Sequence, residues 1–375
     1  MKHYLWQLLW FFVGCAWANI CLAQDFVFSK PQRIPPKIKE YDLLGNTNEG
    51  LLVHKWGDKY HTVEAFNTND MQLKWVKELQ LKDKKAEVIE IITYNNELVV
   101  LYQVKVKKTI TLYARKVTAN LTALSEDIVI DTVTNKTTIR SQQIEFKVKV
   151  SQNKKYIGLL QYHYNFNGLY QIKTTLLNQN LDVLQDVVCN VGEDFLLQQI
   201  EISNEGDVFV LTSESRRSFL NNQTQFTQLK VHLFNSQTKE PNTVLIEKEK
   251  FLFNDVFLSV DNRNKQLVIA GFFSEKQAHA VNGYYYMFLN LKSQQLSQQV
   301  FHNFDEKFIQ KVSKQALKAN EAVYNLKIKT LILRNDGGAL IIGESHYISQ
   351  NGMGRSSFDT FYDNQIAKMD YHYND

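Results

Sequence analysis

The chain has 375 residues, of which 44% are hydrophobic and 22% are charged. This composition is ordinary for a soluble globular protein and excludes long disordered stretches. The net charge is only +4, with 43 Lys and Arg dispersed among 39 Asp and Glu, whereas nucleic-acid binding needs a clustered basic face. We therefore expect no nucleic-acid partner. Aromatic residues are plentiful, with 23 Phe and 18 Tyr, and together with scattered β-branched residues they favour strands.

The N-terminus is typical of a secretory signal peptide over residues 1–23. A short basic start precedes an apolar run over residues 4–13, and small residues lead up to Ala23. We expect cleavage after Ala23 and a mature chain in the periplasm, at the cell surface or outside the cell. The alternatives are a membrane anchor, for which the apolar run is short, and lipidation at Cys15, whose flanking residues fit a lipoprotein poorly. The mature product is not expected to be an integral membrane protein.

Cysteine use agrees with that assignment. Cleavage would remove two of the three cysteines and leave Cys189, so the mature chain could form no internal disulfide. Cys189 lies in an apolar strand pattern over residues 186–191. We interpret it as a small buried hydrophobic residue and not as a nucleophile.

A hairpin recurs six times along residues 24–375. Each copy has an apolar strand, a polar turn that usually contains Asn, and a second apolar run. The copies start near residues 41, 88, 146, 198, 256 and 329, and their second runs start at residues 51, 98, 156, 208, 267 and 339. Asn and Gly suit such turns because tight hairpins need positive φ angles. We expect residues 98–101, 208–211 and 340–342, which lie in the second runs, to be on inner, buried strands.

A second, weaker hairpin follows in most copies and turns at an apolar residue followed by Asn. Examples are Phe66-Asn67, Leu177-Asn178, Phe234-Asn235 and Leu289-Asn290. Two hairpins give four strands, which is the content of one propeller blade. The sequence therefore predicts an all-β protein, a β-propeller of about six four-stranded blades. Stacked β-sandwiches or a β-barrel are the alternative, although neither predicts six similar double hairpins in a row.

The repeated hairpins, above all residues 202–211 (Ile-Ser-Asn-Glu-Gly-Asp-Val-Phe-Val-Leu), resemble those of uncharacterised exported propeller-like proteins of Gram-negative bacteria. The resemblance lies in the general pattern of strands and turns, and it covers roughly residues 40–375. It implies a propeller fold and an envelope location, with no assigned reaction.

Two segments stand outside the repeat. Residues 304–325 have helical periodicity, with apolar residues at Phe304, Phe308, Val312, Ala316, Ala319 and Val323. We expect a helical insertion that caps one propeller face and not a helix that binds a partner. The short strand Phe26–Phe28 is expected to pair beside residues 366–369 and complete the last blade. The alternative is that the chain is part of a longer propeller.

No motif for catalysis or metal binding emerges, so we name no catalytic residue, metal ligand or cofactor. The nine His lack metal-ligand spacing. His163 is interpreted as structural, and His346, at the end of an inner strand, is the most suggestive single His. The Ser-x-x-Lys pattern at residues 151–154 falls on a turn, whereas its chemistry needs a helix. The acidic turn at residues 335–338 is interpreted as a turn only.

The function expected from these features is an exported, non-enzymatic propeller that binds a protein or glycan partner at one face. One alternative is a propeller hydrolase or lyase whose site is assembled from several blades. Another is a structural blade array within a larger envelope protein. Converging acids and His would favour an enzyme, whereas an exposed apolar or aromatic patch would favour a binding protein.

Overall fold

The structure is a computed structural model that describes residues 36–58, 60–134, 143–165, 168–216, 225–235, 240–275, 280–313, 323, 326–335, 338–345 and 372–373. The chain divides into two compact units. The first takes the residues up to Ala86 together with Ile91–Val100 and Arg115–Ile128. The second takes Glu87–Glu90, Leu101–Ala114 and the residues from Val129 onward.

Nearly all described elements are antiparallel strands that pair with their neighbours in sequence. The first sheet contains β1 (Glu40–Thr47), β2 (Gly50–Gly57), β3 (Tyr60–Phe66) and β4 (Leu73–Glu78). The second contains β5 (Glu87–Tyr94), β6 (Glu97–Val106), β7 (Thr109–Thr118) and β8 (Ile128–Thr134). The next strands are β9 (Gln143–Val150), β10 (Tyr156–Asn165), β11 (Gly168–Asn178), β12 (Val183–Ile202), β13 (Val208–Arg216), β14 (Gln225–Phe234) and β15 (Asn242–Glu247).

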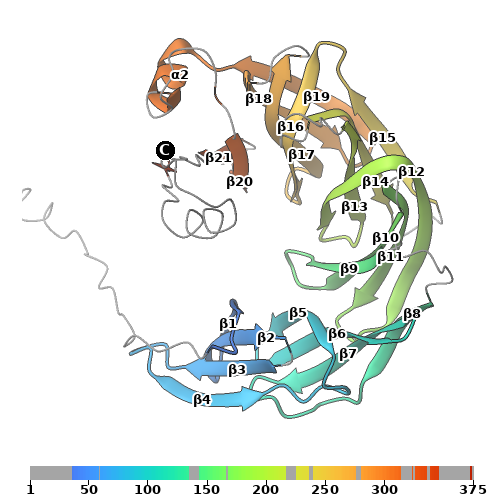
Figure 1. Ribbon diagram of the computed structural model, residues 1–375, viewed down its shortest axis with the longest axis vertical. Helices are drawn as coiled ribbons and strands as arrows, with labels where there is room; N and C mark the ends of the chain where they lie inside the picture. Colours follow the sequence, from blue (N-terminus) through green and yellow to red (C-terminus); the bar gives the residue numbers. More distant parts are fainter. Residues whose placement is uncertain are drawn as a thin grey trace, which may run out of the picture. The chain divides into compact units, whose positions relative to one another are not determined.

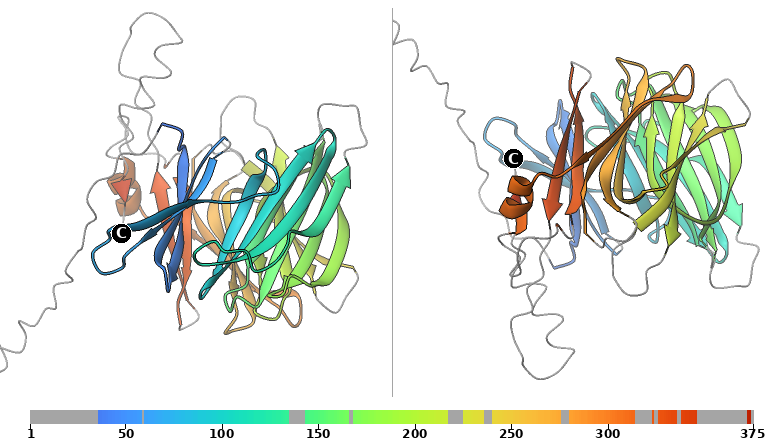
Figure 2. Two further views of the ribbon diagram at one scale, coloured as in Figure 1. Left: turned by 90° about the horizontal axis from the view of Figure 1, so that it is seen from below. Right: turned by 90° about the horizontal axis from the view of Figure 1, so that it is seen from above.

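The chain continues through β16 (Phe251–Asp261), β17 (Gln266–Glu275), β18 (Gly283–Asn290), β19 (Gln295–Asn303), helix α2 (Glu306–Ser313), β20 (Leu326–Leu333), β21 (Ala339–Ser345) and β22 (His372–Tyr373). Strands β9 to β19 form one continuous sheet that consists of three successive four-stranded meanders, and β20 to β22 form a last sheet. Figure 2 shows neighbouring strands within a meander running in opposite directions.

The long strand β12 joins two meanders without a turn. Its first half pairs with β11 and its second half, from Phe195 to Ile202, pairs with β13. Figure 1 shows it as one long arrow. Gly192 has a positive φ of 101° near the middle of the strand, a conformation that favours glycine.

The predicted fold class is confirmed: this is an all-β fold of the propeller type with one helical insertion. The second runs of the six predicted hairpins lie in β2, β6, β10, β13, β17 and β21, each paired to the strand before it. Within the second unit the first strands of successive meanders contact one another, β9 with β12, β12 with β16, and β16 with β20. A sandwich would instead interleave its strands between two packed sheets.

A β-bulge recurs on the first strands. The register shifts between Leu43 and Gly45 in β1, Leu197 and Gln199 in β12, Phe253 and Asp255 in β16, and Ile328 and Thr330 in β20. A bulge redirects the following side chain, and at Gln199 and Asp255 that side chain bonds to the next meander. The amide of Gln199 donates to the Leu258 carbonyl at 2.7 Å and accepts from the Leu258 N–H at 2.8 Å. Asp255 accepts the Ile328 N–H at 2.6 Å.

The positive φ expected of Asn and Gly in the hairpin turns is found at Gly50, Asn95 and Gly206, whereas Lys154 and Lys265 carry it in two other turns. Several turn Asn side chains have a further role and join neighbouring turns. The Asn153 N–H donates to Asn204 Oδ1 at 2.9 Å, and the Asn204 N–H donates to Asn262 Oδ1 at 2.7 Å. The carboxamide oxygens of Asn204 and Asn262 thus reach the turn of the preceding meander.

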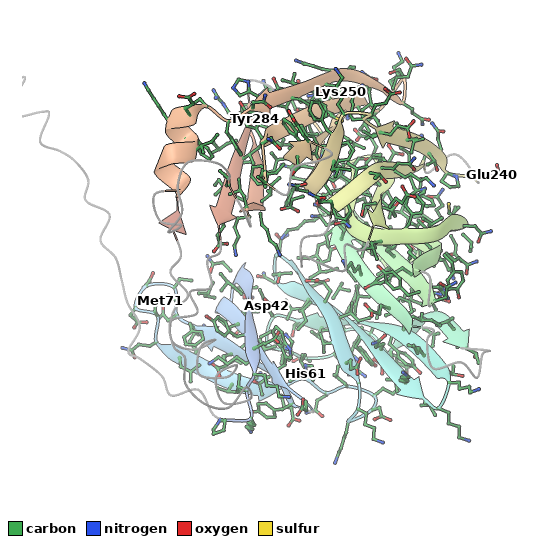
Figure 3. The ribbon with its side chains drawn as sticks, turned by 45° about the horizontal axis from the view of Figure 1, so that its top comes forward. Asp42, His61, Met71, Glu240, Lys250 and Tyr284 are labelled. Atoms are coloured by element: carbon green, nitrogen blue, oxygen red, sulfur yellow. The ribbon has the colours of Figure 1, made fainter. Side chains whose placement is uncertain are left out.

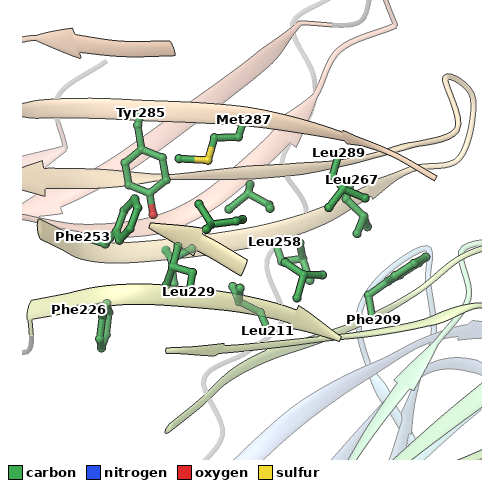
Figure 4. Packing of buried hydrophobic residues seen from close by; sticks show 14 of the residues in the cluster. Phe209, Leu211, Phe226, Leu229, Phe253, Leu258, Leu267, Tyr285, Met287 and Leu289 are labelled. Carbon is green, nitrogen blue, oxygen red and sulfur yellow. The ribbon is translucent and has the colours of Figure 1, made fainter. Parts of the chain in front are cut away.

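The core of the second unit lies between meanders. One cluster gathers side chains of β13 to β18, and Figure 4 shows Tyr285 beside Phe253, with ring centroids 5.1 Å apart. The predicted burial of residues 98–101 and 208–211 is confirmed. The predicted burial of residues 340–342 is wrong, because Leu340 is 52% exposed. Leu340 pairs with Ile332, which is also exposed, whereas Ile341 on the opposite face packs against the core.

The described part of the helical insertion is α2, Glu306–Ser313, and the residues that follow it, 314–322, lie outside the described residues. Asp305 caps α2, since its Oδ1 accepts the Phe308 N–H at 2.7 Å. Phe308 packs with Phe304 against a buried cluster around Phe272, so the apolar helix face is used in packing. Val323, which was expected on that helix, instead pairs with Val281 in a β-bridge.

Some expectations lie outside the described residues, namely the signal peptide, the strand Phe26–Phe28, its expected partners at 366–369, and residues 314–322. Among the residues that the structure describes, no helix is long and apolar enough to cross a membrane.

Candidate functional site

The residues singled out in the sequence have structural environments. His163 is buried on β10, where its ring hydrogen-bonds to Gln161 and lies edge-on to Tyr170. Burial lowers the pKa of His163, so its neutral form is favoured. Nearby, the Lys173 ammonium forms ion pairs with Asp131 at 2.9 Å and Asp186 at 3.2 Å. The interpretation of His163 as a satisfied core histidine agrees with these contacts.

Cys189 is only half-buried, so its predicted full burial is wrong, although it packs against the core cluster around Leu160. Burial raises the pKa of its thiol. Ser151 begins a hairpin turn in which its Oγ accepts the Tyr156 N–H at 3.0 Å. His346 and residues 336–337 lie outside the described residues. In the described part of the chain, no group of three or more His, Cys, Asp or Glu is placed to hold a metal ion.

Aromatic and charged side chains instead gather where β2 turns into β3 in the first sheet. We call this cluster the hairpin end; it consists of Lys37, Lys39, Trp56, Asp58, Tyr60 and His61. The segment before β1 crosses it, and the Lys39 N–H donates to the Trp56 carbonyl at 2.8 Å. Gly57 permits this crossing, because a Cβ there would lie 1.9 Å from the Lys37 carbonyl oxygen. The glycine thus fixes the position of the lysine segment.

Strand register separates the cluster onto two sheet faces. Glu40, Trp56 and His61 form one cross-strand row, so their side chains share a face, on which His54 also lies. Tyr60 is one residue removed from His61 in β3 and therefore points to the opposite face. The first face is called the Trp56 face and the second the Tyr60 face.

Three rings stack on the Trp56 face. The ring of His54 lies 4.8 Å from that of Trp56 and 5.4 Å from that of His61, with interplanar angles of 20° and 12°. His54 is 5% exposed, whereas Trp56 and His61 are partly exposed at the end of the sheet. His61 is labelled in Figure 3. The stack therefore presents a buried inner ring and accessible outer rings.

The hydrogen bonds define which ring nitrogens carry protons. His54 Nε2 and His61 Nδ1 are 3.2 Å apart. The His61 ring also hydrogen-bonds to the Ala86 backbone, and because this bond raises its pKa, His61 is the donor and the Ala86 carbonyl the acceptor. Neutral His61 then carries its proton on Nε2, and its Nδ1 accepts from the His54 Nε2–H. This leaves His54 Nδ1 as an acceptor.

Both imidazoles are neutral near pH 7. Burial, and then the neighbouring His61, lower the pKa of His54 to about 4. Burial also lowers the pKa of His61, although its bond to Ala86 opposes that shift. The pair therefore carries no net charge, and its bonds to each other and to Ala86 hold the two rings in place.

The Tyr60 face carries the charges. The Lys37 ammonium lies 3.6 Å above the centroid of the Tyr60 ring, a cation–π contact. Lys39 forms an ion pair with Asp58, and both are highly exposed. Farther along this face Tyr41 is 65% exposed, and Lys55 pairs with Glu64 at 2.6 Å. The hairpin end thus combines partly exposed aromatic rings with charged groups, which together suit binding.

Sequence reasoning did not find this cluster. A usable indication was present, because His54 and Trp56 are two residues apart in a predicted strand and so share a face. Trp56 and Trp75 are also the two of five tryptophans that lie outside the predicted signal peptide. The pairing of His54 with His61 needed the register of β2 and β3.

No family model and no curated protein sequence match the chain. Similar solved structures include a Dos1 propeller at 12% identity, with 72% of this chain and 59% of that chain covered and a TM-score of 0.42. A Synechocystis apocarotenoid oxygenase has 8% identity, coverage of 78% and 63%, and a TM-score of 0.40. A GH43 β-1,3-galactosidase has 10% identity, coverage of 68% and 52%, and a TM-score of 0.30.

The chain spans less than two thirds of the length of each of these three proteins. Similarities at this level carry no argument about ligand or reaction. The assignment to the propeller type rests on the strand order described above.

Proposed function

We propose that the protein is an exported binding module that holds a glycan at the hairpin end of its first sheet. The observation that carries this proposal is the stack of Trp56 on His54 and His61, with Tyr60 on the opposite face. Accessible rings and uncharged imidazoles meet there at the end of a rigid sheet.

The chemistry of a sugar matches this arrangement. The C–H face of a pyranose ring is apolar and packs on an aromatic ring, while its hydroxyls need both donors and acceptors. Trp56 supplies a partly exposed ring, and the exposed Glu40 carboxylate on the same face supplies an acceptor. The ammonium groups of Lys37 and Lys39 supply donors. The ring stack is ordered before binding, which reduces the entropic cost of association.

The exported location is part of the same proposal. It is supported by residues 1–23, which are typical of a signal peptide. It is also supported by the resemblance of the strand-and-turn pattern to exported propeller-like proteins of Gram-negative bacteria. A glycan partner is available in the periplasm, at the cell surface and outside the cell alike.

Tryptophan fluorescence tests the proposal, because the mature chain would contain only Trp56 and Trp75. Trp75 lies on β4 of the same sheet, where its Nε1–H donates to Glu49 at 3.2 Å, and it serves as the matched control. A panel of oligosaccharides is titrated into the parent, Trp56→Ala and Trp75→Ala. We expect saturable fluorescence changes for the parent and Trp75→Ala and none for Trp56→Ala. Equal binding by all three, or cleavage of a bound oligosaccharide, would contradict a Trp56-centred binding module.

A further inference from the structure

We infer that the hairpin end selects an acidic glycan, one that carries a carboxylate or a sulfate, and that Lys37 recognises the acidic group. This inference rests on the proposed function and names the class of ligand for the same site. It comes from the distribution of charge over the two faces.

Lys37 is the uncompensated cation of the cluster. Lys39 is paired with Asp58, and Lys55 is paired with Glu64. In the described part of the chain no carboxylate lies within ion-pair distance of Lys37, whose ammonium instead rests over the Tyr60 ring. An aromatic ring does not neutralise a cation, so the ammonium retains its attraction for an anion.

The position of Lys37 is also fixed. Its carbonyl packs closely against Gly57, and the Lys39 N–H donates to the Trp56 carbonyl, so the segment is held against β2. The ring beneath the ammonium restrains the side chain. A cation held in this way loses less side-chain entropy on binding than a freely moving surface lysine.

The opposite face carries the opposite charge. Glu40 lies directly across from Trp56 in the register of β1 and β2, and it is exposed. A carboxylate there accepts sugar hydroxyls and repels an acidic group. The acidic group of a ligand that passes round the end of the sheet is therefore directed toward Tyr60 and Lys37, while its neutral hydroxyls face Glu40 beside Trp56.

The test compares oligogalacturonate with its fully methyl-esterified form, which has the same skeleton without the charges, and with a sulfated galactan oligosaccharide. Binding to the mature protein is measured by calorimetry at low and high salt, for the parent, Lys37→Gln, Glu40→Gln and Lys105→Gln. Lys105 is an exposed lysine on β6 and is the control for loss of one positive charge. The Trp56→Ala variant is included with each ligand.

We expect Lys37→Gln to weaken binding of at least one acidic ligand by roughly three- to fivefold, as for an exposed charge pair, and to leave the ester unchanged. Glu40→Gln should strengthen acidic binding, Lys105→Gln should have no effect, and high salt should reduce the difference between acid and ester. The acidic ligand whose affinity falls in Lys37→Gln shows whether the site prefers a carboxylate or a sulfate. Equal affinity for the acid and its ester, or binding of the acidic ligands that Lys37→Gln does not change, would overturn the inference. The proposed function would still stand in that case if the ester bound in a Trp56-dependent way. Absence of any Trp56-dependent binding would overturn both.

Discussion

Replacement of Gln199 by Ala should destabilise the protein by about 2–6 kcal/mol, because Gln199 joins two meanders through the backbone. Its carboxamide takes both the N–H and the C=O of Leu258, and it also donates to Glu201 at 2.9 Å. Leu258 is fully buried, so both groups would lose their partners away from water. Each buried polar group left unpaired costs about 1–3 kcal/mol. Against a typical total of about 5–15 kcal/mol, this loss is large.

Equilibrium urea unfolding followed by circular dichroism measures the effect, with the m-value as a check that the denatured state is unchanged. Gln171→Ala is the matched control, because the Gln171 amide bonds at 3.2 Å to Asn190 on the exposed surface. The control should stay within about 0.5 kcal/mol of the parent. If Gln199→Ala is equally mild, the first-strand bulges do not hold the meanders together as we infer.

Three further predictions concern burial, pH and processing. Val210→Asp should abolish soluble expression, since Val210 is fully buried and an unpaired carboxylate there costs several kcal/mol; normal folding would count against the core assignment. Burial lowers the pKa of His54 and of His232 to about 4, whereas a histidine in the unfolded chain has a pKa of about 6.5. The free energy of unfolding should therefore be highest above pH 6.5 and fall toward pH 4, by roughly 3 kcal/mol per histidine. Unfolding free energies measured from pH 7 to 4 should show this decline, less steeply in His232→Gln, and a flat profile would refute it. Mass spectrometry of the exported protein should give an N-terminus at Gln24, whereas an acyl group on Cys15 would establish the lipoprotein alternative.

The sequence predicted the strands well because their signals are local. Alternating apolar residues and turn-forming Asn and Gly mark each hairpin without knowledge of its neighbours. The bulges could not be predicted, because a register shift depends on the partner strand. The role of Asn204 and Asn262 was missed for the same reason. Their side-chain oxygens accept hydrogen bonds from backbone N–H groups more than 50 positions earlier in the chain.

The candidate site was harder to predict than the fold. Trp56 and His61 are ordinary strand residues by sequence, and they become neighbours through the pairing of β2 with β3. The contact of Lys37 with Tyr60 depends on the crossing at Gly57, which no periodicity indicates. His163 drew attention in the sequence by its position between two tyrosines, yet its partners are internal.

Hydrogen–deuterium exchange of the mature protein, with and without a saturating oligosaccharide, tests the central claim most directly. Residues 55–62 include both rings of the hairpin end and the turn that joins β2 to β3. We predict slower exchange in the peptide covering those residues and in the one covering residues 37–40, with little change in β16 and β20. Protection confined to the first strands of the second unit, or no protection anywhere, would contradict the placement of the site.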